Sequence, residues 1–310
     1  MTTAFFTHPA CLEHDTGQGH PERPERLQAI LMALDEPEFG KLERREAPAA
    51  EIAQIARVHD KTYAQNLLQR VPQRGWAALD GDTLMSAGSG EAALRAAGAM
   101  IAAVDLVMKN GAANAFCAVR PPGHHAESDM AMGFCLFNNV AIGAAHACAT
   151  HGLKRVAIVD FDVHHGNGTQ HIFDHDAQVF YASTHQMPLY PGTGARSERG
   201  VGNICNAPLP PFAGGDAFRD AYEEIVLPAL DRFKPELIMI SAGFDAHRAD
   251  PLASLELEAE DFGWVTDRLL EMAKTHCGGR LVSTLEGGYD LGALAESSAA
   301  HVAALLAAKI

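Results

Sequence analysis

The sequence predicts an α/β fold in which helices cover both faces of a mainly parallel central sheet. Three observations predict it: short apolar strand-like runs, longer helix-like segments between them, and Gly-containing polar clusters directly after several runs. Strands that alternate with helices form parallel sheets, because each connection must cross back over the sheet. The 310 residues contain no internal repeat, low-complexity tract or linker, so we expect a single domain over residues 1–310 with three layers, α/β/α.

Five runs have the composition of buried parallel strands. They are rich in Val, Ile, Leu and Ala, as expected for strands covered on both faces. In chain order they span residues 115–119, 155–159, 179–183, 237–241 and 280–284.

Four longer segments are predicted to be helices. The segment 91–109 is rich in Ala, with apolar residues spaced by three and four, and 139–150 and 216–232 follow the same pattern. The segment 259–275 has acidic residues near its start and Lys274 near its end, which matches the helix dipole.

Composition narrows the classes of function. The net charge is −15 and no Lys/Arg cluster stands out, which argues against a direct nucleic-acid partner and leaves cationic substrates open. The six cysteines are scattered without a C-x-x-C pair and indicate no disulfide framework. We expect a cytoplasmic protein, because the N-terminus has no signal-peptide pattern and the Ala-rich segment is interrupted by Arg95 and Asp105. The sequence leaves a homo-oligomer open.

The stretch DFDVHH at 160–165 follows the strand predicted at 155–159. Side chains alternate along an extended segment, so Asp160, Asp162 and His164 point the same way. Carboxylate and imidazole ligands on one face suit a divalent transition metal, with zinc as the first candidate. The alternative is a strand end that carries solvated polar residues.

Three other predicted strands also end in polar clusters. These are RPPGHH at 120–125, AGFDAH at 242–247 and LEGGYD at 285–290. Taken singly, His124 and His125 could make surface polar contacts, Asp245 could be a turn or N-cap residue, and Tyr289 could be a packed aromatic. Ligands of parallel sheets bind beyond the carboxyl ends of the strands, so four such ends favour one common site.

These motifs, in this order, resemble the histone deacetylase family. The resemblance extends from GHPERPER at 19–26 through GFCLFNNV at 133–140 to Tyr289, nearly the whole chain. The paired Asn residues after Phe137 and Asn167 in HHGNG resemble the class II branch and its bacterial amidohydrolase relatives. The resemblance implies the arginase/deacetylase fold and zinc-dependent hydrolysis of acyl-lysine side chains or related N-acyl amines.

The resemblance also implies residue roles. Asp162, His164 and Asp245 would bind one zinc ion and leave a position for water and substrate. His125 would be the general acid–base, with His124 beside it stabilising charge.

The remaining implied catalytic residues position these groups or bind the reacting oxygen. Asp160 would orient His124, and Asn167 would orient His125. Class I members carry Asp in place of Asn167, and a neutral Asn should leave His125 less basic. Tyr289 would donate a hydrogen bond to the developing oxyanion.

Substrate-binding residues follow from the same resemblance. Gly133 and Phe134, with Tyr190, match the aromatic lining of the acyl-lysine tunnel, although core packing is the alternative for the two aromatics. Leu252 stands where polyamine-selective relatives carry an acidic residue, which favours acyl-lysine or neutral acyl-amine substrates. Asp82 matches a rim residue that holds the substrate backbone. Arg26 matches an Arg of an internal product channel, with a structural ion pair as its alternative.

Two potassium sites are a further implication. The inner one would involve residues around Asp160, Asp162, His164 and Ser183. The outer one would involve Phe173, Asp176 and Val179.

Three alternatives to an acyl-lysine deacetylase remain open at this point. They are an acetylpolyamine amidohydrolase, an arginase-type ureohydrolase with two manganese ions, and a non-catalytic module that binds acylated ligands. The physiological substrate and the preferred acyl chain are not encoded in any pattern of the sequence.

Overall fold

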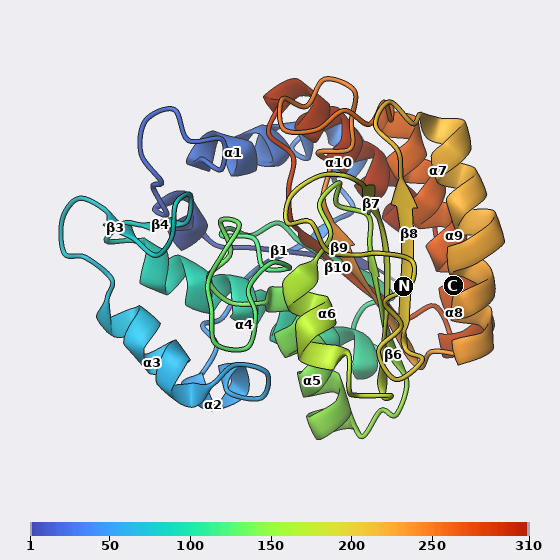
Figure 1. Ribbon diagram of the computed structural model, residues 1–310, viewed down its shortest axis with the longest axis horizontal. Coiled ribbons are helices and arrows are strands. Elements are labelled where there is room, and N and C mark those ends of the chain that lie inside the picture. The colour runs from blue at the N-terminus through green and yellow to red at the C-terminus, as the bar shows by residue number, and fades with distance from the viewer. Residues whose placement is uncertain (1, 309–310) are drawn as a thin grey trace.

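An eight-stranded sheet runs through the centre of the described residues, 2–308, of this computed structural model (Figure 1). Its strands are β1 (Thr3–Thr7), β2 (Glu43–Glu46), β5 (Asn114–Cys117), β6 (Val156–Asp160), β7 (Val179–Gln186), β8 (Ile204–Leu209), β9 (Leu237–Ala242) and β10 (Leu281–Leu285). The strand order is β2-β1-β5-β10-β9-β6-β7-β8, and every neighbouring pair is parallel. A separate antiparallel ribbon joins β3 (Ala77–Ala78) to β4 (Leu84–Met85).

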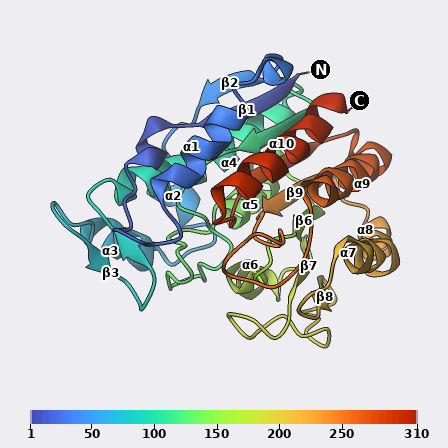
Figure 2. The same cartoon turned by 90° about the horizontal axis from the view of Figure 1, so that it is seen from above.

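Helices cover both faces of this sheet. The α-helices are α1 (Pro24–Ala33), α2 (Ile52–Ile55), α3 (Lys61–Gln69), α4 (Ser89–Met108), α5 (Asn139–His151), α6 (Asn167–Phe173), α7 (Gly215–Ala221), α8 (Leu227–Phe233), α9 (Ala259–Cys277) and α10 (Leu291–Ala307). Two short 3-10 turns, η1 (Pro9–Leu12) and η2 (Pro37–Phe39), and a π-helical turn, η3 (Tyr222–Val226), complete the set. Helix α10 packs between α1 and α9 on one face, and α4 packs on α5 on the other (Figure 2). The predicted three-layer α/β/α arrangement is therefore confirmed.

All five predicted strands are present, as β5, β6, β7, β9 and β10. Every residue of these five strands is buried, which explains why their apolar composition was informative. The four predicted helices correspond to α4, α5, the segment from α7 to α8, and α9. Strands β1, β2 and β8 were not predicted, because β2 is the charged edge segment ERRE and β8 contains Asn206 and Pro208.

The sheet order explains how the polar clusters meet. Strands β5, β10, β9 and β6 are consecutive neighbours in the sheet, although they are far apart in the chain. Because they are parallel, their carboxyl ends lie at one edge, where the four clusters follow them. The fold thus delivers all four clusters to one place.

Two further observations bear on the sequence predictions. All six cysteines are free thiols. No helix within residues 2–308 has the length and apolar character needed to cross a membrane.

Candidate active site

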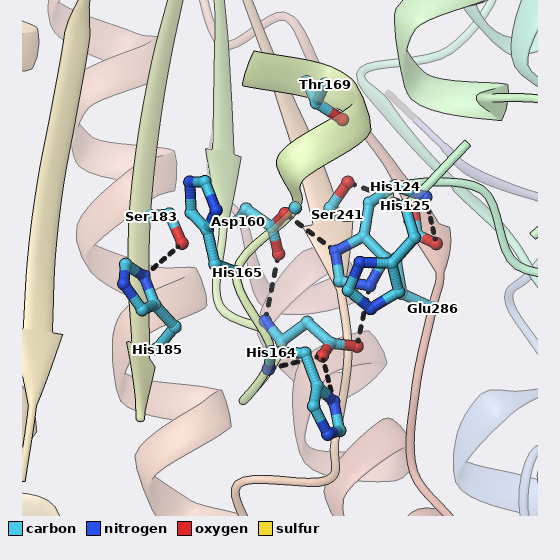
Figure 3. Close-up of polar contacts among 12 residues, drawn as sticks. His124, His125, Asp160, His164, His165, Thr169, Ser183, His185, Ser241 and Glu286 are labelled. Atoms are coloured by element: carbon cyan, nitrogen blue, oxygen red, sulfur yellow. Dashed lines mark hydrogen bonds and ion pairs between the residues drawn. The ribbon is translucent and has the colours of Figure 1, made fainter. Parts of the chain in front are cut away.

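Three donor side chains meet just beyond the ends of β6 and β9, and one of them, His164, is labelled in Figure 3 together with His124 and His125. Donor atoms of Asp162, His164 and Asp245 all lie within 4.8 Å of one another. His164 Nδ1 is 3.2 Å from Asp162 Oδ1 and 3.1 Å from Asp245 Oδ2. All three residues are buried, and Asp245 lies 81 positions from His164 in the chain.

Backbone groups hold the two carboxylates in place. The Val163 N–H donates to Asp245 Oδ1 at 2.9 Å, and the Gly287 N–H donates to Asp162 Oδ2 at 2.7 Å. A Cβ at Gly287 would lie 2.1 Å from Asp245 Oδ2, so only glycine allows the backbone this close. The glycine after β10 therefore shapes the donor cluster.

The electrostatics of this cluster favour a cation between the donors. Burial disfavours the charged imidazole, but hydrogen bonds to Asp162 and Asp245 outweigh it and raise the pKa of His164 to about 10. Two buried carboxylates thus demand positive charge at this position. Two carboxylate oxygens and one imidazole nitrogen are a donor set that zinc accepts, so these residues fit a divalent metal.

His124 and His125 lie beside the cluster with ring centroids 4.0 Å apart, but their partners differ. His124 Nδ1 donates to Asp160 Oδ2 at 3.0 Å, and that carboxylate also accepts from the Tyr181 hydroxyl at 3.0 Å. Burial opposes a charged His124, yet Asp162 and Asp160 hold its pKa well above the usual value. His124 is therefore a cationic neighbour of the donor cluster.

His125 is instead held neutral. Its Nδ1 faces Asn167 Oδ1 at 2.8 Å, while burial and the nearby imidazoles of His124 and His164 keep its pKa well below the usual value. Asn167 Nδ2 donates to Glu127 Oε1 at 2.8 Å, which fixes the orientation of the amide. Sequence reasoning missed Glu127, which has no motif of its own.

Glu286 supports the histidine loop and was also given no role from the sequence. Its Oε2 accepts from the backbone N–H groups of Gly123 at 2.6 Å and His124 at 3.1 Å, and its Oε1 accepts from Ser241 Oγ at 3.1 Å. Burial raises the pKa of Glu286 to about 7. One carboxyl group after β10 thus ties the loop after β5 to β9.

Tyr289 is positioned from two sides. Its backbone N–H donates to Asp250 Oδ2 at 2.7 Å, and Asp250 Oδ1 accepts from the Leu252 N–H at 3.0 Å. The Arg26 guanidinium lies 4.7 Å from the centre of the Tyr289 ring. Burial, offset in part by Arg26, keeps the pKa of Tyr289 well above the usual value, so its hydroxyl remains a hydrogen-bond donor. Asp250 is a third supporting residue that the sequence did not reveal.

A cavity of about 250 Å³ opens above these groups. It is lined by Asp82, His125, Gly133, Phe134, His164, Leu189, Tyr190, Leu252 and Tyr289. Every predicted tunnel and rim residue except Arg26 is therefore part of its wall. His164 of the donor cluster, the neutral imidazole of His125 and the phenol of Tyr289 therefore line the same cavity.

The wall includes a strained turn. Gly133 and Phe134 both have positive φ angles, +55° and +68°, and the Phe134 N–H donates to Thr83 Oγ1 at 3.1 Å. A positive φ is costly for a residue with a bulky side chain, so the surrounding contacts must hold it. The turn places the Phe134 ring edge-on to Tyr289, with centroids 5.8 Å apart.

Arg26 lies behind this wall. Its guanidinium donates to the carbonyls of Glu286 and Gly288, each at 2.5 Å, and to Glu22 Oε1 at 3.0 Å. It is completely buried, and each of its three guanidinium nitrogens donates to one of these groups. The structure therefore supports the structural ion pair rather than a substrate-binding role for Arg26.

The two expected potassium positions differ. At the inner one, the register of β6 and β7 places Asp160 opposite Ser183. At the outer one, the carbonyl groups of Phe173, Asp176 and Val179 converge, but all three accept hydrogen bonds from the Asn203 side chain. At the outer position a hydrogen-bond donor, Asn203 Nδ2, thus lies among the three carbonyls that the resemblance assigns to an ion.

A second group of possible metal ligands lies between α4 and α5. Asp105 Oδ1 is 2.7 Å from the Nε2 atoms of both His146 and His151. Arg57 Nη1 is 2.7 Å from His146 Nδ1, and Lys109 Nζ is 3.2 Å from Asp105 Oδ2. Two cationic side chains in contact with the donors oppose a metal ion, so this group is an ion-pair network.

The α/β/α fold carries a site in which a donor cluster, a neutral imidazole and a phenol surround one cavity. The model of the histone deacetylase domain matches residues 20–305. The chain belongs to the histone deacetylase family, and it is a hydrolytic deacetylase that acts on amides.

Relatives come from several kingdoms. The chain is 42% identical to histone deacetylase 14, chloroplastic, of Arabidopsis thaliana, covering 97% of this chain and 76% of the relative. It is 40% identical to the histone deacetylase-like amidohydrolase of Pseudomonas aeruginosa, covering 93% and 81%. Among solved structures, the HDA15 HD domain matches with a TM-score of 0.91 and 35% identity, covering 99% of this chain and 89% of that one. The arginase/deacetylase fold expected from the motifs is thereby confirmed.

Proposed function

We propose that this chain is a zinc-dependent deacetylase that removes acetyl or related acyl groups from acyl-lysine side chains or small N-acyl amines. The observation that supports it most is the meeting of the Asp162–His164–Asp245 cluster, His125 and Tyr289 at one cavity. Residues 1–310 form one catalytic domain in this proposal, since β1 and α10 both pack into the same three layers.

Asp162, His164 and Asp245 would hold the zinc ion, and His164 would bind as the neutral imidazole through Nδ1. When bound, zinc supplies Lewis-acid polarisation of the amide carbonyl and lowers the pKa of a bound water. A potassium ion at the inner position beside Asp160 and Ser183 belongs to the proposal, supported by the pairing of β6 with β7.

His125 performs the proton transfers. Its neutral Nε2 takes a proton from water as the oxygen attacks the amide carbon, and it returns that proton to the nitrogen as the C–N bond breaks. The products are a carboxylic acid, which keeps the second water proton, and a free amine; near neutral pH they exist as a carboxylate and an ammonium group. Asn167 Oδ1 accepts a hydrogen bond from the protonated Nδ1 of His125. In the neutral ring Nε2 then carries no proton and can accept one.

Tyr289 and His124 stabilise the negative charge that develops. The raised pKa of Tyr289 keeps its hydroxyl protonated, so it donates to the oxygen that was the amide carbonyl. His124, held cationic by Asp160 and Asp162, offsets charge beside the attacking water. Both groups lie in a site with little exposure to solvent, where such interactions are stronger than in water.

The cavity wall supports an apolar acyl-lysine chain as substrate. Phe134, Tyr190, Leu189 and Leu252 present apolar surface, while Asp82 at the wall can accept a backbone N–H of a peptide. Asp82 is also the observation that favours the second candidate, an acetylpolyamine, because it can attract a distant ammonium group. A two-metal ureohydrolase is less well supported, because a single three-donor cluster lies at the cavity among the described residues.

The test compares kcat/KM for acetyl-lysine peptides, longer acyl-lysine peptides and acetylpolyamines, with zinc content measured on the same protein. We expect one zinc per chain and a preference for acyl-lysine. Leu252→Glu should shift preference toward polyamines by adding charge to the wall, and Leu189→Met is the matched control that keeps the wall apolar. A polyamine preference in the unaltered protein would overturn the acyl-lysine assignment, and an inactive zinc-loaded protein would favour a binding module.

A further inference from the structure

Three backbone carbonyl groups converge at the end of α6. Phe173 is the last residue of this helix, Asp176 lies in the following turn and Val179 begins β7. Carbonyl groups at a helix C-terminus lack partners within the helix and carry partial negative charge. The Phe173 carbonyl already accepts from the Asp176 N–H at 3.0 Å, and the Asp176 carbonyl accepts from the Val179 N–H at 3.1 Å. The three oxygens nevertheless share one centre, where a cation or a further hydrogen-bond donor would offset their partial charges.

The side chain of Asn203 fills that centre. Its Nδ2 lies 2.7 Å from the Phe173 carbonyl oxygen, 2.8 Å from that of Val179 and 3.1 Å from that of Asp176. An amide nitrogen has two hydrogens, so the two shorter contacts take one each and the third is shared. Asn203 is only 4% exposed, so water competes little for these bonds.

The environment allows one orientation of the amide. Asn203 Oδ1 accepts from the Val201 N–H at 3.2 Å, and the same N–H also donates to the Asp174 carbonyl at 2.9 Å. The reverse orientation would direct Oδ1 at three carbonyl oxygens and Nδ2 at a backbone N–H, which would leave every contact mismatched. Gly200, with φ of +53°, makes room for this arrangement, since a Cβ there would lie 2.6 Å from Asn203 Oδ1.

We infer that Asn203 takes the place of the outer potassium ion in this chain. The amide nitrogen and a cation would need the same position among the same three oxygens, so the residues present do not fit the ion. The N–H groups of the Asn203 amide offset the partial negative charge of the three carbonyl oxygens without any ion from solution. The inner position is separate, because none of its residues contacts Asn203 in the described part of the chain.

Helix α6 connects Asn203 to the active site. Asn203 anchors the last residue of α6, and the first residue of α6 is Asn167, which faces His125. In this chain the placement of Asn167 is therefore supported by a covalently attached group rather than an exchangeable ion. Asn203 itself touches neither the cavity nor the donor cluster, so it is a positioning residue.

The first test uses the unaltered protein, crystallised with rubidium chloride in place of potassium and sodium salts. Anomalous scattering should show no rubidium between the carbonyls of Phe173, Asp176 and Val179. A rubidium peak at that position would overturn the inference. This measurement does not depend on deacetylase activity, so its failure would leave the proposed function untouched.

The second test opens the position with Asn203→Ala. Thermal unfolding is measured in potassium chloride and in choline chloride at equal ionic strength. The variant should be less stable than the unaltered protein in choline, and potassium should raise its midpoint by several degrees more than it raises that of the unaltered protein. Folding of the variant only in potassium would be the extreme form of the same result.

The matched control is Asn114→Ala. Asn114 is also buried, and its Nδ2 donates to the Leu305 carbonyl at 3.0 Å, but one carbonyl cannot form a cation site. This variant should lose stability without gaining potassium dependence. An equal potassium response in Asn203→Ala and the unaltered protein would contradict the inference that the amide substitutes for an ion.

Discussion

Residues 2–308 contain two groups of three Asp and His donors, and their surroundings differ. The central group, Asp162, His164 and Asp245, is buried at the carboxyl ends of β6 and β9 beside the cavity. The second group, which we call the α4–α5 network, consists of Asp105, His146 and His151 between two helices. Both have the donor types that bind transition metals.

Neighbouring charge separates the two groups. Within residues 2–308, no Lys or Arg forms an ion pair with the central group, and only the imidazoles of His124 and His164 pair with its two carboxylates. In the α4–α5 network, one carboxylate is shared by two imidazoles and Lys109, and Arg57 contacts His146. Donor type and spacing are therefore insufficient to identify a metal site, because the charges around the donors decide whether a cation is needed.

The largest effect on zinc content and kcat/KM is expected from a substitution in the central group. Asp245→Asn removes half of the negative charge of the central pair of carboxylates and weakens one donor. Zinc content should fall from one per chain toward zero, and kcat/KM should fall by more than the roughly 10²–10³-fold that loss of one oxyanion donor costs. Asp105→Asn is the matched control and should change neither. Loss of zinc in the control, or full zinc retention with full activity in Asp245→Asn, would reverse the assignment of the two groups.

Tyr289→Phe should give the next largest effect, because it removes the phenol that works with the central group but leaves the donors intact. We expect kcat to fall by roughly 10²–10³-fold, or about 2.7–4 kcal/mol of transition-state stabilisation, with zinc content unchanged. Tyr222→Phe is the control, since that hydroxyl is buried away from the cavity. A kcat near that of the unaltered protein would exclude the oxyanion role.

The central group was predictable from the sequence, whereas its supporting residues were not. Asp162, His164 and Asp245 follow apolar runs that identify parallel strands, and parallel strands bring their carboxyl ends together. Glu127 and Asp250 act through hydrogen bonds to groups 40 and 39 residues away, and no local pattern records such contacts. The strand order that makes β5, β10, β9 and β6 neighbours is likewise set by packing of the whole sheet.

Two predictions from the resemblance involve hydrogen-bond partners that the motifs did not identify. Phe173, Asp176 and Val179 do bring their carbonyls together as the resemblance implied, but the occupant depends on Asn203, which lies about 24–30 positions away. Arg26 was assigned to a product channel, with a structural ion pair as the alternative, and its guanidinium donates to the loop that carries Tyr289. In both cases the sequence located a polar centre but did not show which partner satisfies it.

A third prediction concerns the partner of each histidine. Each His of the α4–α5 network meets a carboxylate, whereas His125 meets the Asn167 amide with Glu127 behind it. The double variant Asn167→Asp/Glu127→Gln exchanges amide and carboxylate without changing the net charge. A carboxylate beside His125 should raise its pKa by about 1 unit or more.

The sign of the effect follows from the role of His125. The base acts in its neutral form, so a higher pKa keeps it protonated up to a higher pH. The acidic limb of the profile of kcat/KM against pH should therefore move to higher pH in the double variant. Glu127→Gln alone, which keeps a neutral partner, should lower kcat without moving the limb upward. A limb that stays in place in the double variant would show that His125 is not the titrating base.

The smallest effect is expected from the α4–α5 network, whose role in this comparison is structural. Burial would raise the pKa of Asp105, but hydrogen bonds from His146, His151 and Lys109 outweigh it and hold the pKa well below the ordinary value. A carboxyl whose folded pKa is depressed stabilises the fold above its unfolded pKa, and that stability is lost as the pH falls through the folded value. Asp105→Asn should thus lower the free energy of unfolding near neutral pH by about 1 kcal/mol.

The pH dependence distinguishes this network from simple packing. The difference in unfolding free energy between Asp105→Asn and the unaltered protein should shrink as the pH falls below about 4, where the unfolded carboxyl takes up its proton. Asp231→Asn, which breaks the more exposed contact with His276, should cost less than about 0.5 kcal/mol at every pH. If the difference in unfolding free energy for Asp105→Asn stayed constant across this pH range, packing rather than charge would stabilise the contact between α4 and α5. The two donor groups would then differ in burial alone.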